Sequence, residues 1–199
     1  MPCLGKDDGL VLDQGPAGPE IKYRGRNGPG WGPRAWEAAA KANRERWKAL
    51  RDAAYQRGLT EVPELISRAG FRDFVCLYIG EGYKRSRNTV AVANSDPRVI
   101  ALCNRWIRWF ATNKVTYSFQ HHADQHPDEL IRFWSEHLGA SRSSFEYQRK
   151  SNSGRLNGRK WRSRYGVLTV KTNDTQFRSR LQAWIDCVME GWLDSPHGV

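Results

Sequence analysis

Residues 74–82 read Phe-Val-Cys-Leu-Tyr-Ile-Gly-Glu-Gly, and this stretch decides the fold that we expect. Its first six residues form an apolar run of the kind that a buried helix needs. The helix should end at Glu81, between two glycines, where the negative end of the helix dipole makes a carboxylate locally unfavourable. Glu81 is therefore a candidate metal ligand. The alternative is a glycine-capped core helix whose last acid points into water.

The residues after this run indicate two further elements. A basic linker leads into a short β-type run, Thr89–Ala93. An Asx-Pro turn at 94–97 then opens an amphipathic helix, with Ser95 or Asp96 as its cap. The predicted order is helix, basic loop, strand and capped helix, and the bases of the loop are Lys84, Arg85 and Arg87.

This order is similar to the core repeat of the LAGLIDADG homing endonucleases, and Phe74–Gly82 resembles the nine-residue signature of that family. The likeness covers roughly residues 60–190, with Glu81 at the position of the family's metal-binding acid. The chain departs from the pattern at two positions. Ile79 stands where many members carry an acid, and Cys76 replaces a small glycine or alanine.

The resemblance implies a Mg²⁺-dependent endonuclease in which Glu81 and its symmetry mate hold the metal with water and scissile phosphate oxygens. A basic residue near the metal is also implied, and Lys84, Lys150 and Lys171 are the candidates. Asn94 occupies a position where the family often has an amide near the attacking water. A helix-capping turn explains Asn94 more simply, and we prefer that explanation.

A homodimer follows from the same chemistry, because one acid-ended helix per chain supplies half of a two-carboxylate site. Cys76 and Gly80 lie four residues apart on one helix face, and both are small enough to let two such helices cross closely. A two-fold dimer would recognise a near-palindromic double-stranded DNA.

The charge of the chain also points to a polyanionic partner, since the net charge is +11 and the pI is about 9.8. Residues 141–165 carry eight bases and one acid. We expect the strands Phe145–Gln148 and Val167–Thr172 to form a ribbon whose basic connecting loop lies in the DNA major groove. A solvated hairpin tip is the alternative. The predicted contacts in this region are Arg149, Lys150, Arg155, Arg159, Lys160, Arg162 and Arg164.

Composition bounds the class of protein. The chain has 199 residues, 39% of them hydrophobic, and no apolar stretch long enough to cross a bilayer, so we expect one core and no membrane contact. The cysteines form no CxxC pair, which argues against a zinc ribbon and fits a reducing, cytoplasmic location. The histidines His121, His122 and His126 are expected to be surface or phosphate-contacting groups rather than zinc ligands.

The expected architecture is α+β, with one small antiparallel or mixed sheet and helices packed on one side. Residues 1–33 contain eight Gly and five Pro and should form a flexible tail. A basic helix over 34–58, ended by Gly58, should precede a DNA-binding domain at 60–192 and a short tail at 193–199. Further predicted elements are a short helix at Pro63–Ala69, helices Pro97–Phe110 and Pro127–Leu138, a strand Val115–Gln120, and a last helix capped by Asn173.

The sequence therefore predicts a DNA-binding protein that is a candidate site-specific endonuclease. Two alternatives stay open. One is a DNA-binding transcriptional regulator with the same fold that does not cleave DNA. The other is an RNA-binding splicing factor, because Tyr147, Trp161 and Tyr165 could stack on unpaired bases.

Overall fold

Helices and short strands alternate along the chain and build an α+β structure. The computed structural model describes residues 33–150 and 163–193, and the chain divides into two units, 1–42 and 43–199. The predicted tail at 1–33 therefore lies almost wholly outside the described residues. The helices are α1 (Pro33–Leu65), α2 (Phe71–Glu81), α3 (Pro97–Phe110), α4 (Pro127–Leu138), the 3₁₀ turn η1 (Arg142–Ser144) and α5 (Thr175–Leu193).

The strands β1 (Thr89–Asn94), β2 (Val115–His121), β3 (Phe145–Arg149) and β4 (Val167–Asn173) form one mixed sheet in the order β1-β4-β2-β3. β4 pairs antiparallel with both β1 and β2, whereas β2 and β3 are parallel. The expected ribbon of β3 and β4 is therefore wrong. α4 carries the chain from β2 back to a parallel position beside it, and this connection puts β2 between β3 and β4.

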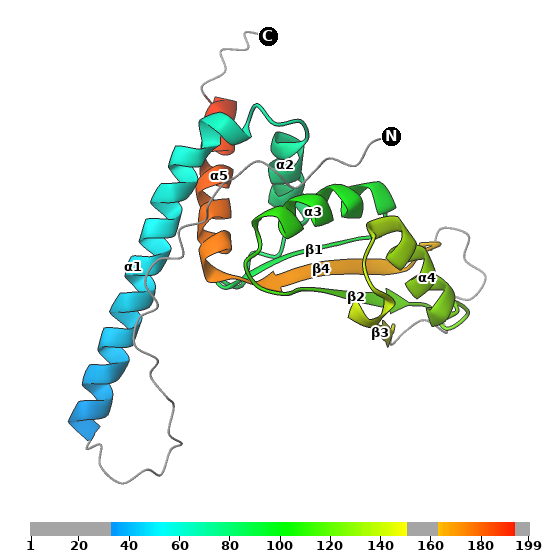
Figure 1. Ribbon diagram of the computed structural model, residues 1–199, viewed down its shortest axis with the longest axis horizontal. Helices are drawn as coiled ribbons and strands as arrows, with labels where there is room; N and C mark the ends of the chain where they lie inside the picture. Colours follow the sequence, from blue (N-terminus) through cyan, green and yellow to red (C-terminus); the bar gives the residue numbers. More distant parts are fainter. Residues whose placement is uncertain (1–32, 151–162, 194–199) are drawn as a thin grey trace. The chain divides into compact units, whose positions relative to one another are not determined.

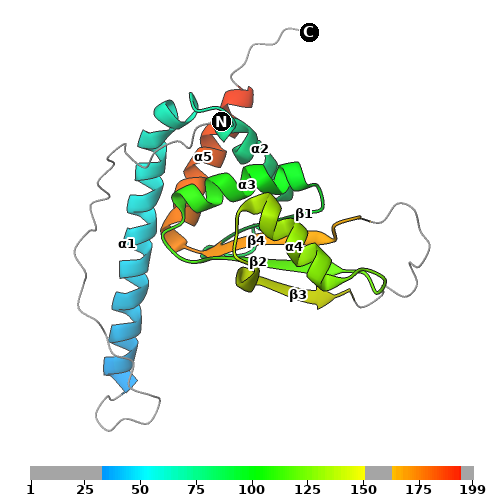
Figure 2. The same ribbon diagram turned by 45° about the vertical axis from the view of Figure 1, so that its right-hand side comes forward.

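Four helices lie on one face of the sheet, as α2, α3, α4 and α5 do in both views of the molecule (Figures 1 and 2). Strand residues alternate accordingly. Val92, Phe119 and Val170 are buried beneath the helices, while Ser118 and Lys171 on the other side are exposed. Successive side chains of a strand point to opposite faces of the sheet. Buried and exposed residues therefore alternate when helices cover only one of the two faces.

Aromatic side chains dominate the core. Trp106, Trp134 and Trp184 are almost completely buried, as their positions on the apolar helix faces predict. Phe71 of α2 lies edge-on against Trp106 at 5.3 Å and against Trp184 at 5.2 Å between ring centroids, so one ring joins three helices. Burial also raises the pKa of the Cys103 thiol to about 12.

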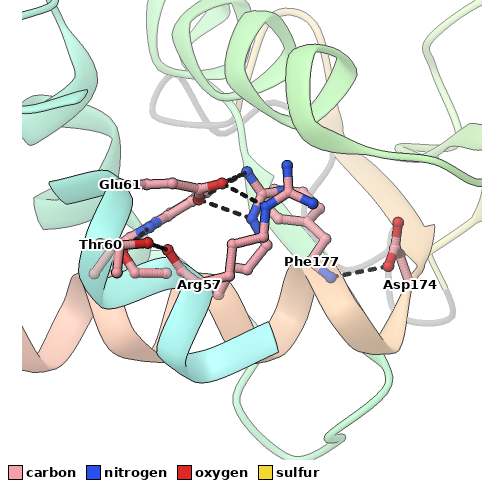
Figure 3. Close-up of polar contacts among 8 residues, drawn as sticks. Arg57, Thr60, Glu61, Asp174 and Phe177 are labelled. Atoms are coloured by element: carbon pink, nitrogen blue, oxygen red, sulfur yellow. Dashed lines mark hydrogen bonds and ion pairs between the residues drawn. The ribbon is translucent and has the colours of Figure 1, made fainter. Parts of the chain in front are cut away.

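Local capping explains where two helices begin. Asp96 accepts a 2.9 Å hydrogen bond from the backbone N–H of Arg98, and Pro97 fills the first position of α3. The last helix is capped by Asp174 rather than by Asn173, because Asp174 accepts from the N–H of Phe177 at 2.9 Å (Figure 3). Asp174 also accepts two hydrogen bonds from Thr112, which tie the start of α5 to the end of α3.

Helix α1 is longer than the sequence predicts. It passes through Gly58 and Pro63 and ends at Leu65, so Gly58 is not its stop and Pro63–Ala69 is not a separate helix. The reason for the absence of a side chain at residue 58 is a tertiary contact with α5. Gly58 is buried against α5, where a β-carbon would lie 2.8 Å from that of Ala183. Its carbonyl accepts a 3.1 Å hydrogen bond from the indole of Trp184.

Two polar contacts flank this crossing of α1 and α5. Arg180 donates to the carboxylate of Glu61 at 2.9 and 3.0 Å, and Arg57 binds the same carboxylate at 2.8 Å (Figure 3). Tyr55 donates to Asp186 at 2.9 Å, and this hydrogen bond raises the pKa of Tyr55 to about 12. Among the described residues, no helix is long and apolar enough to span a membrane.

We predict that Gly58→Ala lowers the free energy of unfolding by about 1–3 kcal/mol, because the added methyl group overpacks the crossing. Gly191→Ala is the matched control, since a β-carbon there meets nothing within 4 Å. The control should leave stability unchanged or raise it by up to about 1 kcal/mol. Urea unfolding of both variants measures the difference, and equal stability of the two would contradict the close crossing.

Candidate nucleic-acid interface

Glu81 is the last residue of α2 and is exposed. Its carboxylate makes no hydrogen bond or ion pair with any residue that the structure describes. The ammonium group of Lys84 donates to the carbonyl of Ile79, which places a base at the same helix end. Of the three candidate lysines, Lys84 is thus the one held at the end of the helix that carries Glu81.

The chain continues from Glu81 along the free edge of β1. Gly82 forms a bridge with Val92, and the N–H of Tyr83 donates to the carbonyl of Ala91 at 2.8 Å. Helix α2 therefore feeds directly into the sheet, and this pairing fixes Glu81 at the sheet's edge.

The loop between α2 and β1 is basic, exposed and fixed at both ends. Lys84, Arg85 and Arg87 are all exposed. Their contact with DNA stays a prediction. Beyond them, Asn88 donates its N–H to Ser86 at 3.1 Å and accepts from the hydroxyl of Thr175 at 3.2 Å. The loop thus presents three exposed cations after Glu81 on a short, tethered segment, and Lys84 is the one held at the helix end.

The face of the sheet opposite the helices is polar and open. No helix of the described chain covers it (Figures 1 and 2). Strand register gathers its side chains into rows, for example Glu146, Ser118 and Thr169 across β3, β2 and β4. Besides Glu146 and Lys171, the polar residues on this face are Thr89, Thr116, Ser118, Gln120, Gln148, Thr169 and Asn173.

Hydroxyl and amide side chains on such a surface can hydrogen-bond to the edges of bases, and a β-ribbon or sheet fits the DNA major groove. Sequence reasoning did not single out this face. The signal was present in the alternate polar positions of Val115–His121 and Val167–Asn173, but the same pattern describes any solvent-facing strand.

The basic segment between β3 and β4 is described only at its flanks. Arg149 and Lys150 are exposed at the end of β3, and the N–H of Lys150 donates to the carbonyl of His121. On the other flank, Gln125 donates to the carbonyls of Ser163 and Arg164 at 3.0 and 2.8 Å. Both flanks thus meet the turn after β2, at one end of the sheet. Arg155, Arg159, Lys160 and Arg162 lie outside the described residues.

The histidines differ in their surroundings, and His126 is exposed at the start of α4. His121 and His122 are buried, and the ring of His121 contacts the carbonyl of His122 at 3.0 Å. The ring of His137 contacts the carbonyl of Pro97 at 3.0 Å. Within residues 33–150 and 163–193, no three His, Cys, Asp or Glu side chains could hold a metal ion together. The expectation that His121 and His122 lie on the surface is wrong, because both are buried, His121 at the end of β2 and His122 directly after it.

Two further predicted residues have clear surroundings. The side chain of Asn94 accepts from the N–H of Asp96 at 2.8 Å, which confirms the capping explanation. On α2, Gly80 is exposed, a β-carbon added there would meet nothing within 4 Å, and Cys76 is half-buried. In the part of the chain that the structure describes, nothing covers this helix face at Gly80. The expected helix crossing stays a prediction.

No protein-family profile, curated protein or solved structure matches this chain.

We predict that Gly166→Ala destabilises the flank of the basic segment. Gly166 has φ of 67°, and a β-carbon would lie 2.5 Å from the carbonyl oxygen of Gln120. Gly139→Ala is the control, because Gly139 has φ of 58° but no neighbour within 4 Å. The control should lose about 1–2 kcal/mol from backbone strain alone. Gly166→Ala should lose at least about 1 kcal/mol more from the clash, as measured by urea unfolding.

Proposed function

We propose that this protein binds double-stranded DNA on the open face of its sheet and cleaves it as a Mg²⁺-dependent endonuclease with a LAGLIDADG-like fold. The observation that carries the proposal is the position of Glu81. It is an unpaired, exposed acid at a helix end, fixed to the sheet edge by the Gly82–Val92 bridge and followed by three exposed bases.

The fold supports the proposal through the order of its elements. The acid-ended helix α2, the strand β1 and the Asx-Pro-capped helix α3 follow one another as in the family's core repeat. The insertion of α4 and β3 between β2 and β4 leaves β1, β4 and β2 as an antiparallel unit.

Charge supports DNA as the partner. Cations stand beside the open face at Lys84, Arg85 and Arg87 near β1 and at Arg149 and Lys150 at the end of β3. The face itself is nearly neutral and rich in amides and hydroxyls. Phosphate contacts at the rim and base contacts in the middle are the division that sequence-specific DNA binding requires.

The residues present fit half of a magnesium site. Mg²⁺ is usually bound through one or two carboxylates together with waters and substrate phosphates, and Glu81 offers one unengaged carboxylate per chain. A second copy would supply the other. When bound, the metal would polarise the scissile phosphate, lower the pKa of the attacking water and stabilise the leaving oxygen. Lys84, held at the helix end, would attract the phosphate to Glu81.

We predict that Glu81→Gln abolishes Mg²⁺- or Mn²⁺-dependent nicking of a plasmid that carries the target, while DNA binding persists. The reason is that the amide retains the shape of the side chain but loses the charge that holds the metal. Glu136→Gln, an exposed acid on α4, is the control and should nick like the wild type. Chelation with EDTA should stop the wild type as well.

The outcomes of this assay separate the candidate functions. Binding without nicking by the wild type would reject cleavage and favour the non-catalytic regulator. Nicking that survives Glu81→Gln would place the catalytic acid elsewhere in the chain. Absence of any duplex binding would reject the proposal as a whole.

A second prediction concerns oligomeric state. Gly80→Leu should weaken dimerisation and DNA cleavage together, because the larger side chain keeps two α2 helices apart. The monomer should stay folded, since the site is open to solvent in a single chain. Sedimentation velocity at micromolar concentration, with and without DNA, measures this. A wild type that is monomeric in both conditions would remove the two-carboxylate mechanism.

A further inference from the structure

A second basic surface lies outside the interface described so far. A groove of about 560 Å³ has two walls. One wall is the middle of α1, and the other is formed by the residues at which β1 and α5 begin. All of the residues that line it belong to the unit 43–199. They are Asn43, Arg44, Trp47, Lys48 and Arg51 from α1, with Asn88 and Thr175 on the other wall.

The groove is built to attract an anion. Arg44, Lys48 and Arg51 follow one another at helical spacing on one face of α1, and no carboxylate of the described residues lines the groove. None of the three forms an ion pair with a residue that the structure describes. Three like charges this close repel one another, and a chain of phosphates would relieve that repulsion. Trp47, a residue that is 44% exposed, adds an apolar surface against which a sugar can pack.

The two walls of the groove are held by contacts that do not involve its bases. The Glu61–Arg180 ion pair fixes α1 against α5 (Figure 3). The crossing at Gly58 and the Tyr55–Asp186 hydrogen bond do the same. The hydroxyl of Thr175 donates to Asn88 and closes the opposite wall. The bases of α1 are therefore presented on a supported helix face and are free for a ligand.

The groove also continues the open face of the sheet. Asn88 directly precedes Thr89, and Thr175 lies just past Asn173. Thr89 and Asn173 face each other in the β1–β4 register, and their side chains share a 3.0 Å hydrogen bond. The groove thus opens at the end of the strands opposite the one where Lys150 and Ser163 lie.

We propose that this groove binds the phosphate backbone of the same DNA duplex, on the flank of the segment that lies on the sheet. The inference rests on the proposed function and extends it. Gly82 pairs with Val92, and Asn88 lies four residues away from Val92, which is about 13 Å along the strand. The phosphates in the groove would therefore lie several base pairs from the one at Glu81 and contribute affinity rather than chemistry.

The test compares the wild type with the full-length triple variant Arg44→Ala, Lys48→Ala, Arg51→Ala. The probe is a duplex that the wild type selects from a random-sequence pool. The slope of log K against log salt for this duplex should become shallower by about two to three units, at about 0.9 per lost phosphate contact. Hydroxyl-radical footprinting should show loss of protection on the flanks, with the central protection kept. The position of the nick should not change.

The control is Arg105→Ala, Arg108→Ala, Arg132→Ala, which removes three exposed bases from the helices on the other face of the sheet. The control should keep both the wild-type slope and the flanking footprint. If the first triple variant does not fold, Lys48→Ala alone should reduce the slope by about one unit.

A wild-type slope and footprint in the α1 variant would overturn the inference while the proposed function stands. An equal loss in both triple variants would also overturn it, because the effect would then be one of net charge. If the wild type binds single-stranded RNA but no duplex DNA, both the proposed binding of DNA in the groove and the proposed function are rejected.

Discussion

The aromatic contacts around Phe71 are the interaction on which the rest of the structure depends. Phe71 opens α2 and packs on Trp106 of α3 and Trp184 of α5. Each indole also donates outward, Trp106 to the carbonyl of Gly70 at 3.0 Å and Trp184 to that of Gly58 at 3.1 Å. One cluster therefore sets the direction of α2, which ends at the candidate site, and the place where α1 crosses α5. Replacing any of these rings would move the site as well as loosen the core.

Helices were predictable where residues close together in sequence determine their bounds. Pro97–Phe110 and Pro127–Leu138 have the predicted bounds, because apolar periodicity and a proline at the first position suffice to define them. The errors arise where the cause is distant in sequence. Gly58 looked like a helix stop, yet its lack of a side chain serves the approach of Ala183. The pairing of β3 could not be inferred from β4, its neighbour in sequence, because the crossover through α4 decides it.

The candidate site was predictable in part for the same reason. The break after the apolar helix and the bases that follow it are local features that the sequence shows, whereas the sequence left open whether Glu81 binds a metal or points into water. The open sheet face and the groove beside α1 are formed by segments that lie far apart in the chain, so neither could be assembled from residue spacing. Together they put cations at both ends of one polar surface. In the proposed DNA complex, long-range attraction and base-specific contact would come from different residues.

The central position of β4 has a consequence for the order in which the protein folds. Among the described strands, β1 has β4 as its only strand neighbour, and β2 also pairs with β4. Residues 167–173 leave the ribosome long after β1 and β2 have emerged. Until then the edges of β1 and β2 that pair with β4 stay unpaired, and unpaired strand edges are prone to aggregation during synthesis. The sheet is therefore completed late in synthesis, when the strand nearest the C-terminus pairs between β1 and β2.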